Sequence, residues 1–107
     1  MKEVILQEGD HISYTYTKKS ITFDEDISIN LKNRERDEKV MVDVCRDDDD
    51  NLVIGVGDHA EKYVAQVEIP PRQYVEESGT DSQRNETVIR KAVDFNIENC
   101  TVYLFAL

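Results

Sequence analysis

Apolar and polar residues alternate along much of this chain with a period of two, the spacing of an extended strand. The clearest case is Ile27-Ser28-Ile29-Asn30-Leu31, in which three apolar side chains share one face. Residues 20–23 and 39–45 repeat the pattern. Further segments rich in β-branched, aromatic and other apolar residues are 4–6, 11–17, 52–57 and 100–107. The sequence therefore predicts several short strands.

Two segments fit more than one secondary structure. The apolar residues of 58–69 fit both helical and strand spacing, but Pro70 and Pro71 would cut a helix to about two or three turns, so a strand is predicted. Residues 87–97 are equally ambiguous, and extended structure is expected from about Ala92 onward.

Two further segments differ sharply in polarity. Residues 76–83 contain no core-forming side chain and predict an exposed, mobile loop, with a contact loop as the functional alternative. Residues 100–107 are apolar on both faces. This predicts a strand buried centrally in the fold in preference to one buried between subunits.

Together these segments predict an all-β fold: a small antiparallel sandwich or barrel of about seven to eight strands with at most one short helix. The 107 residues suit one domain, 1–107, and contain no internal repeat or linker.

The charge balance narrows the possible partners. With 23 acidic and 13 basic residues the chain has a formal net charge of −10, which disfavours direct binding to nucleic-acid phosphates or to an anionic membrane. The same charge would suit an acidic inhibitor that mimics nucleic acid, although solubility is the commoner reason for it. The apolar run after Met1 ends at Leu6, too early for a signal peptide, and predicts a cytoplasmic or virion-associated protein.

Four consecutive aspartates, residues 47–50, stand between two predicted strands. A helix-flanked calcium loop is excluded because Leu52 occupies the position where such a loop requires glycine, and because the flanking segments are predicted to be strands. A looser calcium site would use Asp47, Asp49 and Asp50, with residues 24–26 approaching from another turn. A hydrated turn is the preferred interpretation, since acidic residues favour turns without any ligand.

Catalytic and cofactor motifs are weak. Residues 55–60 match a dinucleotide-binding glycine pattern, but the prolines leave no room for its helix, and we expect no cofactor. His11, Cys45, His59 and Cys100 lack the close pairs typical of zinc sites. A dyad of Cys45 with His59 lacks a visible oxyanion site, so no catalytic residue is assigned.

The segment 69–74 contains two prolines followed by Arg72 and Tyr74. The prolines are expected to stop a strand, whereas Arg72 and Tyr74 are candidate partner-binding residues because both types are enriched in interface hot spots. The sequence thus predicts a non-catalytic protein-interaction or structural assembly module, binding a protein partner or itself. A small accessory component of a larger particle, such as a phage virion, would fit. An acidic inhibitor and a calcium-binding β module remain alternatives.

Overall fold

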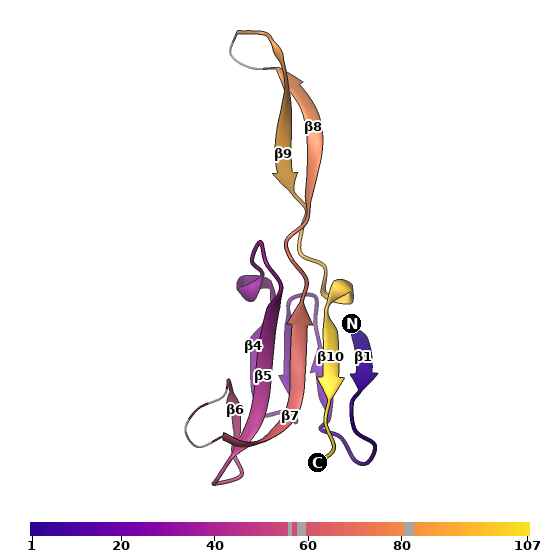
Figure 1. Ribbon diagram of the computed structural model, residues 1–107, viewed down its shortest axis with the longest axis vertical. Helices are drawn as coiled ribbons and strands as arrows, with labels where there is room; N and C mark the ends of the chain where they lie inside the picture. Colours follow the sequence, from indigo (N-terminus) through magenta and orange to yellow (C-terminus); the bar gives the residue numbers. More distant parts are fainter. Residues whose placement is uncertain (56, 58–59, 81–82) are drawn as a thin grey trace.

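The computed structural model describes residues 1–55, 57, 60–80 and 83–107, with the backbone alone for 60 and 61. The described part contains ten strands and two short 3-10 helices (Figure 1). The elements in chain order are β1 (Lys2–Ile5), β2 (Tyr14–Tyr16), β3 (Ser20–Phe23), β4 (Ile27–Asn30), η1 (Lys32–Arg34), β5 (Val40–Asp47), β6 (Leu52–Ile54), β7 (Ala60–Ile69), β8 (Tyr74–Thr80), β9 (Glu86–Ala92), η2 (Ile97–Asn99) and β10 (Thr101–Leu104). The all-β prediction is confirmed, with ten strands in place of seven or eight.

The strands form three sheets. A five-stranded sheet has the order β1-β10-β7-β5-β6, in which β1 pairs with β10 in parallel and the other pairs are antiparallel. A three-stranded antiparallel sheet has the order β2-β3-β4, and β8 and β9 form a separate two-stranded ribbon. We call the first two sheets the body and the β8–β9 ribbon the arm.

The core lies between the two sheets of the body. Val42, Val67 and Val102 stand opposite one another on β5, β7 and β10, and each is at most 3% exposed. Phe23 and Ile29 bring the second sheet into the same buried cluster. The apolar faces of the two sheets thus pack against each other around one interior, as in a β-sandwich.

Several strand predictions are confirmed. Residues 60–69 form a strand, β7, which ends at Ile69 immediately before Pro70 and Pro71. Strand β10 lies between β1 and β7 and is buried inside the body, as the apolar character of its two faces predicts. The aspartate run connects β5 to β6 in a hairpin.

The structure corrects the sequence prediction for the arm. Residues 76–80, predicted to be in a loop, belong to strand β8, and its partner β9 ends at Ala92, where extended structure was expected to begin. Cross-strand pairing explains both errors: the weak strand formers of β8 pair in register with Thr87, Val88 and Ile89 of β9. A pattern within one segment does not reveal such a partner.

The arm projects from the body along the long axis of the molecule (Figure 1), which measures 63 × 26 × 21 Å. All seven residues of β9 are exposed, and so are most of β8. Val88 is 64% exposed, Ile89 50% and Val75 46%. The arm therefore presents apolar side chains to solvent on a ribbon that no other described strand covers.

Candidate functional site

The register of the arm assigns its side chains to two faces. Directly paired residues of an antiparallel ribbon point to the same side, so Val75, Glu77, Ile89 and Lys91 share one face. The Ile89 side chain lies over Gly79, where a Cβ atom would come within 2.4 Å of its Cδ1. Gly79 therefore accommodates Ile89 against the ribbon.

The opposite face carries Tyr74, Glu76, Val88 and Arg90. The Arg90 guanidinium stacks over the Tyr74 ring, 3.8 Å from its centroid, and Glu76 stands directly across from Arg90. A cation over an aromatic ring and an opposite charge across the ribbon each stabilise the hairpin modestly. Val88 remains the most exposed large apolar side chain of the described residues.

The arm also differs from the body in charge. Residues 74–92 contain four acidic and three basic residues, a net charge of −1, so −9 of the total −10 belongs to the remainder of the chain. The arm is thus the nearly uncharged part of an acidic protein, and it meets less electrostatic repulsion from another acidic surface than the body does.

Arg72 and Tyr74, the candidate partner-binding residues, lie at the root of the arm. The Arg72 Nε donates to Glu35 Oε1 at 3.3 Å and its Nη2 donates to the Glu35 carbonyl at 3.0 Å. The Tyr74 hydroxyl donates to Asp37. These contacts fix the arm to the segment after η1. Contact of Arg72 and Tyr74 with a partner stays a prediction.

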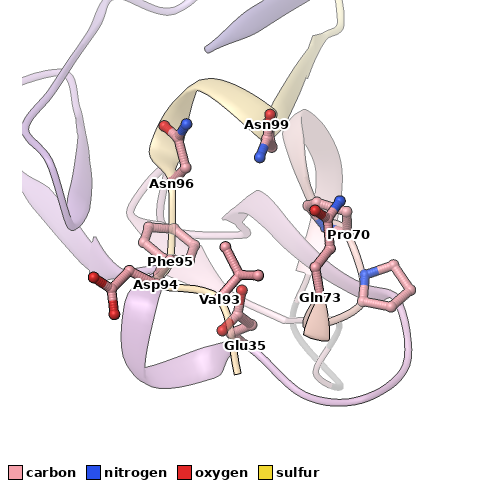
Figure 2. A pocket seen from close by; sticks show the side chains of 9 residues that line it. Glu35, Pro70, Gln73, Val93, Asp94, Phe95, Asn96 and Asn99 are labelled. Carbon is pink, nitrogen blue, oxygen red and sulfur yellow. The ribbon is translucent and has the colours of Figure 1, made fainter. Parts of the chain in front are cut away.

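A small cavity lies beside this root (Figure 2). Figure 2 shows Val93 and Phe95 from the segment after β9, Pro70 and Gln73 from the segment before β8, and Glu35 between them. Its volume is about 130 Å³. Ligand pockets for small molecules usually have about 300–1,000 Å³, so this hollow is too small for a typical organic ligand.

The aspartate run forms a hydrogen-bonded turn. Asp47 Oδ1 accepts the backbone amides of Asp49 and Asn51, each at 2.9 Å, and Asp50 takes a left-handed φ of 63°. Aspartate suits both roles, because its short side chain caps turns and tolerates this conformation. One oxygen of a candidate calcium ligand is therefore engaged within the turn.

Arg46 lies between the two acidic turns that the sequence analysis considered together. Its Nη2 is 3.7 Å from Asp24 Oδ2, and its Nε is 3.7 Å from Asp50 Oδ1. The turns do lie close to each other, and an arginine side chain bridges them. Across the described residues, no three His, Cys, Asp or Glu side chains gather in a geometry that could hold a metal ion. Calcium binding by Asp47, Asp49 and Asp50 stays a prediction.

The two cysteines are separate, buried and reduced. Burial raises the pKa of the Cys100 thiol to about 11, and burial followed by the nearby Asp43 raises that of Cys45. Both thiols are thus protonated near neutral pH, a state of low nucleophilicity. The His11 Nε2 donates to the Gln7 carbonyl at 2.6 Å, and His59 lies outside the described residues.

The arm is the feature that sequence reasoning missed. One signal was available: Thr87-Val88-Ile89 is a run of three consecutive β-branched residues, typical of a strand.

The chain matches no protein-family model, no curated protein and no solved structure. In the described part of the chain, no helix has the length and apolar character needed to cross a membrane.

Proposed function

We propose that this protein is a non-catalytic interaction or assembly module and that the β8–β9 arm is its contact element. The observation that carries the proposal is the exposure of Val75, Val88 and Ile89 on a ribbon outside the core. A two-stranded ribbon alone is at best marginally stable in water, and stable sheets add strands or pack against another element. A partner on the arm would supply that missing contact.

The organisation of the chain supports this assignment. The buried cluster contains no residue of β8 or β9, so the arm contributes nothing to the core of the body. Its root is nevertheless fixed by Arg72, Tyr74 and the Arg72 amide, which donates to the Arg36 carbonyl at 2.8 Å. A ribbon that is directed outward and held at its base is suited to reach another protein. A small accessory component of a larger particle, such as a phage virion, fits this use.

The proposal is tested in the source cells with a tagged full-length chain and the variant Val88→Asp/Ile89→Asp. Both substituted side chains are at least half exposed, so the body should unfold at an unchanged temperature. The wild-type chain is expected to elute in an assembly larger than one chain, and the variant is expected to lose that assembly.

A control places one added negative charge, half that of the arm variant, on the body at Met41, which is 40% exposed on β5. Met41→Asp should retain the assembly. Retention of the assembly by the arm variant, or equal loss in the Met41→Asp control, would overturn the proposal.

A further inference from the structure

One hydrogen bond at the root fixes which backbone groups of the arm point outward. The Val93 amide donates to the Gln73 carbonyl at 2.8 Å, so Gln73 and Val93 form a hydrogen-bonded pair. Pairs alternate along an antiparallel ribbon between hydrogen-bonded and non-hydrogen-bonded types. The outer edge of β9 therefore presents the N–H and C=O groups of Glu86, Val88, Arg90 and Ala92.

This edge has no partner among the described strands, in which β9 pairs with β8 alone. An edge strand with free backbone groups and β-branched side chains is a template for another strand. β9 contains no proline, its pairing with β8 has no bulge, and its outward residue Val88 is 64% exposed. Charged side chains can also discourage edge pairing, and those of the outward set are Glu86 and Arg90.

The sequence of β9 is complementary to itself. If two β9 strands pair antiparallel across a two-fold axis at Val88, then Val88 meets Val88 of the second copy. Glu86 meets Arg90 in both halves of the pair, and Thr87 meets Ile89. The pairs of Val88 with itself and of Glu86 with Arg90 join outward-pointing residues, as a hydrogen-bonded register requires.

The other edge of the arm does not share this property. Registers of β8 centred on Glu76 or Glu77 would place like charges directly opposite, which destabilises a sheet. A register of β8 centred on Ser78 avoids like charges, but it pairs Glu77 with Gly79 and Glu76 with Thr80, so it contains no opposite-charge pair such as Glu86 with Arg90. Self-pairing therefore favours β9 over β8.

We infer that the partner of the arm is a second copy of this chain, joined through antiparallel β9–β9 pairing centred on Val88. This inference rests on the proposed function and names the occupant of the same surface. The two ribbons then form one continuous four-stranded sheet, above the strand number at which sheets become stable alone.

The antiparallel arrangement also keeps the acidic bodies apart. The two arms point in opposite directions, so the bodies lie at opposite ends of the shared sheet. A strand the length of β9 spans about 24 Å at roughly 3.4 Å per residue, more than twice the Debye length of about 8 Å at physiological salt. The body charge is thus largely screened across the dimer.

The first test measures the mass of the purified full-length chain by light scattering at increasing concentration. The wild type is expected to approach twice the 12.4 kDa of one chain. Val88→Pro removes an outward amide and should give a monomer. Ser78→Pro removes the outward amide directly across the ribbon, on the β8 edge, and should still dimerise.

The second test uses charge reversal. Glu86→Arg and Arg90→Glu each create two like-charge contacts in a homodimer, and each should weaken dimerisation roughly tenfold or more. Mixing the two variants restores both opposite-charge pairs, so the mixture should form a heterodimer with near wild-type affinity. The double variant Glu86→Arg/Arg90→Glu should dimerise by itself.

A wild-type chain that stays monomeric at about 0.1 mM, well above the micromolar range of weak specific association, would overturn the inference. So would equal loss in Ser78→Pro and Val88→Pro, or a mixture that fails to associate. A monomeric pure chain whose assembly in cells still depends on Val88 and Ile89 would reject the second copy as partner and leave the proposed function standing.

Discussion

Replacing Asp47 by alanine removes the oxygen that closes the β5–β6 turn. Asp47 Oδ1 accepts two backbone amides at 2.9 Å, those of Asp49 and Asn51. A net contribution of about 0.5–1.5 kcal/mol per hydrogen bond applies, and the low end is appropriate because water reaches the exposed turn. Asp47→Ala should therefore lower the free energy of unfolding by about 1 kcal/mol. For a domain of this size that corresponds to a fall in Tm of roughly 4–8 °C.

Asp47→Asn is the matched variant, since its amide oxygen can accept the same two hydrogen bonds. Thermal unfolding by circular dichroism should place it close to the wild type, and Asp49→Ala, whose backbone amide is unchanged, should behave likewise. Millimolar calcium should leave all three Tm values unchanged if the run serves only as a turn. Equal stability of Asp47→Ala and the wild type would refute the reasoning from hydrogen bonds. A calcium-dependent rise in Tm that Asp47→Asn abolishes would instead establish the cation site.

Three further perturbations test the fold and the root of the arm. Phe23→Ala should lower the free energy of unfolding, measured by chemical denaturation, by about 3–5 kcal/mol because Phe23 is fully buried between the sheets. Val88→Ala should lower it by less than about 0.5 kcal/mol because Val88 is exposed. Similar losses for both variants would contradict the sandwich core. Arg72→Ala removes the contacts with Glu35 and should reduce the residual dipolar couplings of β8 and β9 relative to those of β7, and unchanged couplings would show that Arg72 does not fix the arm. Burial raises the pKa of Cys100 from 9.0 to about 11, so the stabilisation by the buried, protonated thiol is complete below pH 9 and is lost as the pH rises towards 11. The difference in free energy of unfolding between the wild type and Cys100→Ala should therefore shrink over that pH range. A constant difference would contradict the assigned burial.

The strands of the body could be predicted from the sequence because each has its own pattern of apolar and polar residues. In Ile27-Ser28-Ile29 and in Val40, Val42 and Val44 the period of two directly marks the face that the core buries. The proline pair also marked the end of β7 correctly, since proline cannot continue a ladder. Such local signals depend on burial of one face, which the body provides.

The arm could not be predicted in the same way because it buries neither face. β8 contains Glu76, Glu77, Ser78 and Gly79, which have weak strand preference, and it is extended because β9 pairs with it. The outward set of backbone groups on β9 depends on the pairing register, which only the hydrogen bond from Val93 to Gln73 fixes. The bridge of Arg46 between Asp24 and Asp50 likewise joins turns that are separate in the sequence.

Hydrogen exchange in the dilute full-length chain tests most directly the claim that a self-sufficient sandwich carries a separate interaction arm. Amides of β5, β7 and β10 should exchange through global unfolding, with the full stability of the body. Amides of β8 and β9 should exchange through local opening at a much lower free energy, even though they are paired. The contrary result is that amides of the arm exchange with the same free energy as those of β7 and that both free energies change in parallel as denaturant is added. That result would show that the arm is part of the cooperative core and would contradict the account.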